Sequence, residues 1–559
     1  MKSFRLPPSL DYRPPAMGAR GMAATSQPLA TLAAVDLLRE GGTAVDAAIA
    51  ANAVLSVTEP HMCGPGGDLF AMVWDPAHRE VVGLNASGRS PLGLGLAEMR
   101  RAVGSESTIP LRGPLTLTAP GAVAGWAALH ARFGAKPWAR LFAPAIALAA
   151  EGFAVGARSS LWWRRAVEEM VGGDFELQSY AAFRRGFGAK GGPEPGHLRV
   201  NPGLAALYRR LGAEGPESFR RGPVVEAMLT ASRTAGGFLE QADFDAISAD
   251  WTPPLTMEYR GCTVHALPPN GQGLSLLQIL GMLEIVAPDA GRGEMDAHWW
   301  HLYLEAKKLA FADRARWFAD PAFATTPCET LLSPDYLAAR AGLIDPDRAA
   351  RDATPGDVRV PASDTTYLAV ADSAGCMVSL IQSLFSPFGS YLVADPFGFA
   401  LQSRASGFSL VDGHPNVYAP GKRPFHTIMP GFVTRQGEGL LALGAIGADM
   451  QPQAQAQILA RILAEGRDVQ RAGALPRMRH QGGALPTGQG LPLPGEIYHE
   501  AGYDPGLLEE LRRRGHLLLP LTDSVRSFTG GYQGIMRDPG EGVWWGGSDH
   551  RLDGCALGF

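Results

Sequence analysis

The fold is decided by one stretch of the chain: Asp364-Thr-Thr-Tyr-Leu-Ala-Val-Ala-Asp372, then Ser373-Ala-Gly375, then Cys376-Met-Val-Ser-Leu-Ile-Gln-Ser-Leu384. Two β-branched and apolar runs joined by three residues that end in glycine are typical of a β-hairpin whose glycine is left-handed. If Asp372 faces Cys376, the ladder places Thr365 opposite Ser383. A bulge at Gly375 would shift that pairing by one residue. The sequence therefore predicts two hydroxyl groups side by side near the start of a strand.

Two interpretations of Thr365 follow from this hairpin. A Thr-Thr pair is usually an ordinary piece of strand, and the hairpin alone permits that reading. The alternative is that the Asp364–Thr365 bond is cut, which turns Thr365 into an N-terminal nucleophile whose freed α-amino group acts as the base. Such a site needs backbone N–H groups for the oxyanion and a small hydroxyl that orients the nucleophile. The hairpin by itself does not choose between the two.

Length and composition describe an ordinary globular chain. The 559 residues are 46% hydrophobic and 19% charged, which supplies a large core and argues against disorder. A net charge of −5 and a pI near 6.2 disfavour nucleic acid or an anionic membrane as a partner. At roughly 100–200 residues per domain, the length alone suggests three or four domains. No long linker or charge block marks a boundary, and we interpret residues 186–196 as a surface loop.

The cysteines and the N-terminal residues bear on the cellular compartment. The cysteines are scattered and form no C-x-x-C pair, which disfavours a disulfide framework and a zinc site. They are Cys63, Cys262, Cys328, Cys376 and Cys555. Residues 1–15 lack the apolar core of a signal peptide, and no run approaches the roughly 18 apolar residues of a membrane span. We therefore expect a soluble cytoplasmic protein that needs no metal or other cofactor.

Periodicity predicts six clear helices and several short strands. In the first helix apolar residues recur from Leu29 at helical spacing, with Pro28 at the start and Gly41 at the end. The second is rich in alanine, which suits close helix packing. The expected helices cover 28–40, 44–55, 141–150, 276–285, 298–318 and 453–464. The expected strands include 115–118, 262–266 and 440–443.

Other clusters of chemically active side chains favour structural roles. His298, His301 and Glu305 share one face of a predicted helix, but their spacing is not that of an H-E-x-x-H zinc site, so packing or capping is the better interpretation. The segment 271–273 lacks the glycine spacing of a nucleotide-binding loop. Nothing near Cys63 in the sequence lowers the pKa of its thiol, so we expect a small buried residue there and not a nucleophile.

Nine short motifs occur in order along the chain. They are Gly21-Met-Ala-Ala-Thr-Ser26, Gly41-Gly-Thr-Ala-Val-Asp-Ala-Ala48, Glu59-Pro-His61, Gly64-Pro-Gly-Gly-Asp68, Ala119-Pro-Gly-Ala-Val-Ala-Gly125, Glu305-Ala-Lys-Lys-Leu-Ala-Phe-Ala-Asp-Arg314, Asp364-Thr-Thr366, Gly421-Lys-Arg-Pro424 and Gly547-Ser-Asp-His-Arg551. Each motif alone is weak. Together, from Gly21 to the last residue, they make the chain resemble the γ-glutamyltranspeptidase family of N-terminal nucleophile (Ntn) hydrolases.

The resemblance implies an α+β fold, the four-layer αββα sandwich of Ntn hydrolases, made as a proenzyme. Self-cleavage would divide the chain into a large subunit, 1–364, and a small subunit, 365–559, that stay interlocked as one domain. By position, Thr365 is the nucleophile and base, and Ser383 is the supporting hydroxyl. The oxyanion hole falls on Gly447 and Ala448, where backbone N–H groups do the work. The resemblance implies no cofactor.

The chain departs from the family where a glutamyl group would be held by its carboxylate. The gripping arginine is expected in Asn85-Ala-Ser-Gly-Arg-Ser-Pro91, where its position is taken by Ser87 and Arg89 is displaced by two residues. The paired serines that assist the carboxylate fall on His426 and Thr427. For His426, a hydrogen-bonded core histidine and a substrate contact are equally compatible with the sequence.

The residues that would hold the α-amino group are also replaced. They fall on Phe385, Arg404 and Gly407. An ammonium needs acceptors around it, but Phe385 supplies none and Arg404 would repel it. Arg404 could grip a carboxylate in bidentate fashion, although an ion pair between subunits is the alternative role. The segments 401–404 and 423–427 resemble the branch of oxamate amidohydrolases and glutaryl-cephalosporin acylases.

The sequence therefore predicts an autoprocessed N-terminal-threonine amidohydrolase or acyltransferase. Its acyl group would carry a carboxylate without a neighbouring amine, as in oxamate or a glutaryl amide. A conventional glutathione hydrolase or γ-glutamyltransferase is the alternative within the family, and an unprocessed, inactive binding scaffold is the alternative outside it. The expected partners are a small-molecule amide and the two subunits of one precursor, and a dimer of processed heterodimers stays open. The segment 408–423, which would form a lid, is short and predicts an open site.

Overall fold

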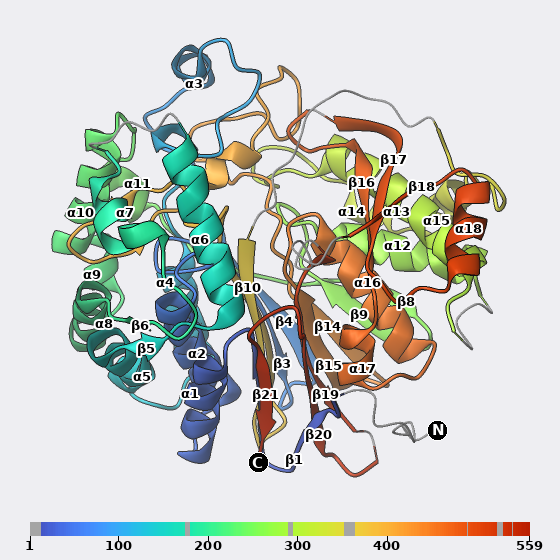
Figure 1. Ribbon diagram of the computed structural model, residues 1–559, viewed down its shortest axis with the longest axis horizontal. Helices are drawn as coiled ribbons and strands as arrows, with labels where there is room; N and C mark the ends of the chain where they lie inside the picture. Colours follow the sequence, from blue (N-terminus) through green and yellow to red (C-terminus); the bar gives the residue numbers. More distant parts are fainter. Residues whose placement is uncertain are drawn as a thin grey trace.

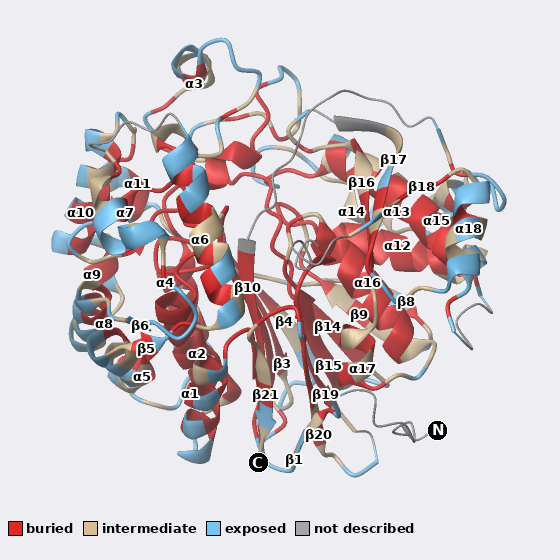
Figure 2. Cartoon of the chain, viewed as in Figure 1, coloured by how far each residue is buried: buried red, intermediate tan, exposed pale blue. Residues whose placement is uncertain are grey.

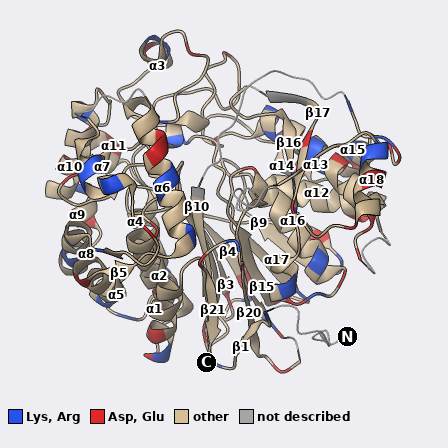
Figure 3. Cartoon of the chain, in the orientation of Figure 1, with Lys and Arg blue, Asp and Glu red and all other residues tan. Residues whose placement is uncertain are grey.

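Two seven-stranded sheets lie face to face at the centre of the molecule, and helices cover the outer face of each (Figure 1). The computed structural model describes residues 13–173, 179–288, 294–351, 364–488, 490–521, 529–538 and 540–559. The strands of both sheets and the helices next to them are mostly buried (Figure 2). Charged residues lie chiefly on the outer helices and loops (Figure 3). The arrangement is the expected αββα sandwich.

The first sheet contains the hairpin that begins at Asp364. Its order is β21 (Cys555–Gly558), β2 (Met22–Thr25), β10 (Asp364–Ala371), β11 (Met377–Phe385), β3 (Asp68–Asp75), β4 (Glu80–Ala86) and β7 (Asp250–Thr252). Every neighbouring pair is antiparallel. Because β10 and β11 occupy the middle, the hairpin is held on each side by a strand that precedes the Asp364–Thr365 bond, β2 next to β10 and β3 next to β11.

The second sheet packs against the first. Its order is β1 (Ala16–Gly18), β20 (Trp544–Ser548), β19 (Tyr532–Arg537), β15 (Glu438–Ala445), β14 (Gly431–Arg435), β9 (Cys262–Ala266) and β8 (Leu255–Tyr259). The sheets approach closely where Tyr367 of β10 lies over Gly444 of β15. A Cβ atom at Gly444 would come within 2.3 Å of the Tyr367 ring, so only glycine fits.

Alanine-rich helices cover the first sheet. They are α1 (Pro28–Arg39), α2 (Ala44–Thr58), α4 (Ala122–Phe133), α5 (Trp138–Glu151) and α8 (Pro202–Glu214). Every residue of α2 is buried, and its short side chains allow helices and sheet to approach from all sides. Thr43 and Asp46 form a capping box at its start, which satisfies the free N–H groups of the first turn.

The helices over the second sheet carry several charged residues into the interior. They are α12 (Gly273–Val286), α13 (Ala297–Trp317), α16 (Met450–Leu463) and α17 (Val469–Ala474). The long helix α13 buries Lys307, Lys308 and Arg314, whose charges need partners or solvent in such a position. No helix in the described part of the chain combines the length and apolar character needed to cross a membrane.

The remaining helices and strands lie outside the two seven-stranded sheets. The helices are α3 (Leu96–Val103), α6 (Ala157–Gly172), α7 (Ala181–Gly186), α9 (Glu217–Arg220), α10 (Pro223–Thr234), α11 (Gln241–Asp245), α14 (Cys328–Leu331), α15 (Pro334–Ala341) and α18 (Pro505–Arg513). The strands are β5 (Phe153–Ala154), β6 (Leu198–Arg199), β12 (Val393–Ala394), β13 (Phe399–Ala400), β16 (Met478–Ala484), β17 (Gly490–His499) and β18 (Leu517–Pro520). Three short 3₁₀ turns cover Pro114–Thr116, Ala189–Gly191 and Arg404–Gly407.

All six helices expected from periodicity are present, as are the strands at 262–266 and 440–443. The strand expected at 115–118 is wrong, because the chain forms a 3₁₀ turn at Pro114–Thr116. Gly113 precedes the turn with φ 91°, and the Thr116 hydroxyl donates to the Gly113 carbonyl at 2.8 Å. These local hydrogen bonds compete with a β-ladder and bend the apolar run.

Candidate active site

The hairpin of β10 and β11 places Thr365 at an irregularity in the ladder. Thr366 pairs with Gln382, and the ladder continues in register to the turn, where Gly375 has φ 88°. Towards the start of β10 the register shifts, so the bulge lies at Thr365 and not at Gly375. The Thr365 hydroxyl nevertheless donates to the Ser383 hydroxyl oxygen at 3.3 Å. The expected pair of hydroxyl groups is therefore present, and the bulge frees Thr365 from strict strand geometry.

Ser383 holds the Thr365 hydroxyl through a set of converging donors. Its oxygen also accepts from the Phe385 amide at 2.8 Å and from Arg404 Nη2 at 2.9 Å. Phe385 adopts φ 79°, a left-handed conformation that is rare for a bulky residue. Backbone strain of this kind persists where the surrounding structure enforces it, which is common at functional sites.

Arg404 is a fully buried cation beside the nucleophile. Its Nη1 donates to the Thr427 hydroxyl at 3.2 Å, and its guanidinium carbon lies 4.7 Å from the centre of the Phe385 ring. Within the described residues, its Nε atom has no hydrogen-bond partner, and no carboxylate lies within ion-pair distance of its guanidinium. Burial lowers the pKa of Arg404 to about 9, so the group stays charged at neutral pH. The ion pair considered from the sequence is thus not formed within the described residues.

Asp68 and His426 form a second buried pair near Arg404. His426 Nε2 donates to one Asp68 oxygen at 3.0 Å, and the Gln402 amide donates to the other at 2.9 Å. Burial alone would raise the pKa of Asp68, but the hydrogen bond from His426 and the charge of Arg404 lower it on balance. Burial lowers the pKa of His426 to about 3, so its ring is neutral. Its Nδ1 is then an acceptor, and it has no partner within the described residues.

Sequence reasoning missed the role of Asp68. In the sequence Asp68 is only the last residue of the motif Gly64-Pro-Gly-Gly-Asp68, whereas in the structure it occupies the first position of β3. Its oxygen Oδ1 also accepts from the amides of Gly88 at 2.8 Å and Gly121 at 3.0 Å. A Cβ atom at either glycine would collide with a backbone carbonyl, so these positions need glycine to approach the carboxylate. An aspartate after Gly-Pro-Gly-Gly was the available signal.

The turn expected to form the oxyanion hole connects β15 to α16. Gly447 has φ 113° and Ala448 has φ 54°, so both residues leave the strand in left-handed conformations. Within the described residues the amide groups of Gly447 and Ala448 have no protein acceptor. The Gln272 amide donates to the carbonyls of Ala448 at 2.8 Å and Thr427 at 2.5 Å. Gln272 therefore ties this turn to the segment that Arg404 also contacts.

Ser87 and Arg89 lie apart from the hydrogen bonds around Thr365. The Ser87 hydroxyl accepts from the Asn270 amide at 3.1 Å, and the same amide nitrogen donates to the Pro424 carbonyl at 2.7 Å. Arg89 donates to the Gly421 carbonyl at 3.1 Å and lies 3.7 Å from an Asp320 oxygen. Arg89 thus anchors the loop around Gly421, and its charge is directed to a protein carboxylate.

The two adjacent threonines have different partners. The Thr366 hydroxyl donates to Glu59 Oε2 at 3.0 Å, and the Ser26 hydroxyl donates to the same oxygen at 2.5 Å. Nearby Cys63 is buried, and burial raises the pKa of its thiol. Cys63 therefore stays protonated, which agrees with the expectation that it is not a nucleophile.

The short segment 408–423 does not leave an open site in the uncut chain. The Asn416 amide donates to the carbonyls of Gly407 at 2.7 Å and Pro486 at 2.9 Å, which joins this segment to the loop after β16. Thr365 and Arg404 are both buried. The open site expected from the length of the segment is therefore not seen in this form of the protein.

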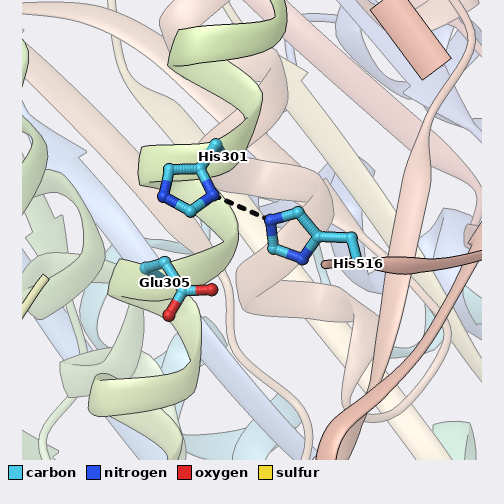
Figure 4. Close-up of side chains that lie close together, drawn as sticks. All are labelled: His301, Glu305 and His516. Carbon is cyan, nitrogen blue, oxygen red and sulfur yellow. Dashed lines mark hydrogen bonds between the residues drawn. The ribbon is translucent and has the colours of Figure 1, made fainter. Parts of the chain in front are cut away.

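The helical histidines are drawn into a different cluster from the one considered in the sequence. His301 and Glu305 of α13 meet His516 (Figure 4), whereas His298 lies next to Arg514. His301 Nδ1 is hydrogen-bonded to His516 Nε2 at 2.9 Å, and Glu305 accepts from Lys308 at 2.7 Å. Since the carboxylate already pairs with a lysine, the contacts fit a packed polar network better than a cation site.

Replacing Asp68 with asparagine is expected to destabilise the fold. The change removes a buried negative charge near Arg404 and disturbs the hydrogen bonds that the carboxylate accepts from His426 and Gln402, which costs about 3 kcal/mol of unfolding free energy. The Asp68 pKa is lowered by folding, so its contribution is present above about pH 4 and lost as the pH falls through the folded-state pKa. Urea unfolding at several pH values measures this difference. Asp75→Asn, at the other end of β3 and paired with exposed His78, is the control and should change stability by under about 0.5 kcal/mol.

Fold and site together define a class of protein. A four-layer αββα sandwich that presents a threonine near the start of a central strand, with a hydroxyl beside it, is the architecture of the N-terminal nucleophile hydrolases. The sequence profile of the gamma-glutamyltranspeptidase family matches residues 30–559. The chain belongs to this family and is an enzyme that acts on amide bonds.

Relatives and solved structures agree over the full length. The chain is 33% identical over 550 residues to the glutathione hydrolase-like YwrD proenzyme of Bacillus subtilis, covering 97% of this chain and 99% of the relative. It is 33% identical over 554 residues to the oxamate amidohydrolase proenzyme of Klebsiella pneumoniae, with the same coverage. The crystal structure of cephalosporin acylase from Bacillus halodurans superposes with a TM-score of 0.90 at 34% identity, covering 100% of this chain and 99% of that one.

Proposed function

We propose that the protein is an autoprocessed amidohydrolase that acts on an acyl group bearing a carboxylate. The chain is cut between Asp364 and Thr365 into subunits 1–364 and 365–559. The observation that carries the proposal is the connected set of Thr365, Ser383 and Arg404, in which a nucleophile and a buried cation share one hydroxyl. Relatives that are themselves named proenzymes support the cleavage.

The reaction follows from the groups around the freed threonine. The α-amino group of Thr365 takes the proton of its own hydroxyl as the oxygen attacks the amide carbonyl. The N–H groups of Gly447 and Ala448 stabilise the oxyanion of the tetrahedral intermediate. When the carbon–nitrogen bond breaks, the ammonium returns the proton to the leaving amine. Water then attacks the acyl-enzyme, and the α-amino group of Thr365 again acts as the base. This step releases the acid and restores the free threonine hydroxyl.

The acyl specificity rests on Arg404 and Phe385. A buried guanidinium with an N–H that has no acceptor among the described residues favours a carboxylate, because charge-assisted hydrogen bonds are strong where water is excluded. Phe385 offers its ring and no acceptor, so an α-ammonium group would lose its hydration without replacement. Oxamate and glutaryl amides present a carboxylate without that ammonium. His426 Nδ1 and the Thr427 hydroxyl are the additional polar groups that contact the substrate.

The proposal is tested by a panel of amides on purified, processed protein. Glutaryl anilide or oxamate should be hydrolysed with kcat/KM at least about tenfold above that of γ-glutamyl anilide, because the glutamyl ammonium has no acceptor near Phe385. Denaturing electrophoresis, run in parallel, should show two fragments, the smaller of 195 residues beginning at Thr365. Preference for the glutamyl substrate would favour a conventional γ-glutamyltransferase. An intact chain without activity would favour a binding scaffold.

A further inference from the structure

A cationic cavity lies beside the turn formed by Gly447 and Ala448. It is lined from α13 by Lys307 and Arg314, from β16 by Arg479, and by Asp449, which directly follows Ala448 in the chain. The cavity is narrow: it leaves about 20 Å³ for a water-sized group, at the base of an opening to solvent. Nothing in the proposed reaction so far uses these residues.

The cavity holds more positive than negative charge. Lys307, Arg314 and Arg479 are each buried, and Asp449 is the one acidic residue in its described lining. Arg314 Nη1 donates to Asp449 at 2.6 Å, but its Nε and Nη2 atoms have no partner within the described residues. Buried N–H groups of a guanidinium without acceptors are costly, and an anion would satisfy them.

Lys307 has hydrogen-bond partners, but none of them carries a negative charge. Its ammonium donates to His480 Nδ1 at 2.8 Å and to the Gly482 carbonyl at 3.5 Å, and it lies 3.8 Å from the centre of the Phe311 ring. His480 Nε2 is hydrogen-bonded to the Pro494 carbonyl, so His480 Nδ1 serves as the acceptor. Burial and the nearby Arg314 hold the pKa of Lys307 well below its usual value. A bound anion would oppose both causes of this lowered pKa, because it would place a negative charge beside the buried ammonium.

The cavity is connected to the reacting centre by direct contacts. Arg314 Nη1 also donates to Gln272 Oε1 at 2.7 Å, and the Gln272 amide donates to the Ala448 carbonyl. The Arg314 guanidinium carbon lies 5.5 Å from the centre of the Phe425 ring, and Phe425 precedes His426. The cavity therefore borders the oxyanion turn, whereas Arg404 is the cation that contacts Ser383.

We propose that this cavity is an anion subsite for a carboxylate on the amine side of the scissile amide. The preferred substrates would then carry two carboxylates, one in the acyl group at Arg404 and one in the leaving group at Lys307, Arg314 and Arg479. This inference rests on the proposed amidohydrolase function and adds the chemistry of the leaving group.

The test compares glutaryl amides that share the acyl group and differ in the amine. The amines are aniline, 3-aminobenzoate and 4-aminobenzoate. With the processed enzyme, at least one aminobenzoate amide should have a higher kcat/KM than the anilide. In Lys307→Met the ratio of the two kcat/KM values should fall about tenfold, the effect of losing one charge-assisted hydrogen bond. Arg479→Met should also lower this ratio. Because it changes a different residue of the cavity, it keeps the test valid if Lys307→Met fails to fold.

Lys308→Met is the matched control, because Lys308 is the neighbouring buried lysine of α13 and pairs with Glu305 instead of facing the cavity. Its ratio should stay within about twofold of the wild-type value, a difference well under 1 kcal/mol. Calorimetric binding of the two aminobenzoates and aniline to the same proteins supplies a readout that needs no turnover. Absence of hydrolysis of every amide would refute the proposed function, whereas binding would still report on the subsite. Equal ratios in wild type and Lys307→Met, with equal binding of aniline and the aminobenzoates, would overturn the subsite.

Discussion

Thr365→Ala is expected to remain a single chain of 59.2 kDa and to lose amide hydrolysis entirely. The side chain is proposed both to attack the preceding peptide bond and to attack the substrate, so one substitution removes both reactions. Loss of a hydrolase nucleophile lowers kcat on the order of 10⁶-fold, which places activity below detection. Denaturing electrophoresis and mass spectrometry of the purified variant measure the first effect, and hydrolysis of glutaryl anilide measures the second.

Thr366→Ala is the control because it removes the adjacent hydroxyl, which donates to Glu59 and not to Ser383. This variant should still yield a small fragment that begins at Thr365. Thr365→Ser retains a hydroxyl and should be cut more slowly than wild type. Two fragments from Thr365→Ala, or an uncut Thr366→Ala, would show that the nucleophile had been assigned to the wrong threonine.

Arg404→Gln is expected to remove the preference for an acyl carboxylate. The ratio of kcat/KM for glutaryl anilide to that for butyryl anilide should fall by about 100-fold, since a hydrogen bond to a charged group contributes up to about 3 kcal/mol. The ratio is the useful quantity because Arg404 also donates to Ser383, so turnover of both substrates will decline. Arg404→Lys keeps the charge but not the planar guanidinium. Its ratio of kcat/KM values should lie between those of the wild type and Arg404→Gln.

Arg423→Gln is the matched control for this experiment. Arg423 is also buried, but its Nη1 lies 2.7 Å from an Asp250 oxygen and its Nε donates to the Ser87 carbonyl at 3.0 Å. Its charge is already paired, so the ratio should change by less than about threefold, under 1 kcal/mol. An unchanged ratio in Arg404→Gln, together with rapid turnover of γ-glutamyl anilide, would contradict the account of the acyl site.

The sequence by itself determined the architecture and the identity of the family. The hairpin at Thr365 follows from two β-branched and apolar runs joined by a turn with a left-handed glycine, which are local preferences of the backbone. The order of the nine motifs then fixed the αββα sandwich, and the helix periodicities were right to within a few residues. Ser383 was placed beside Thr365 by counting along one turn, because the two residues are joined by short-range geometry.

Only the tertiary structure decided how the polar groups of the site are paired. Asp68 and His426 are 358 positions apart in the chain, and no local pattern predicts their hydrogen bond. The same holds for Arg314 and Asp449, 135 positions apart, which border the cationic cavity. Whether a buried charge is free to bind a ligand depends on which partners the fold brings within hydrogen-bond distance. Burial and pairing therefore distinguish Arg404 from Arg89 and Arg423, three arginines that look equally available in the sequence.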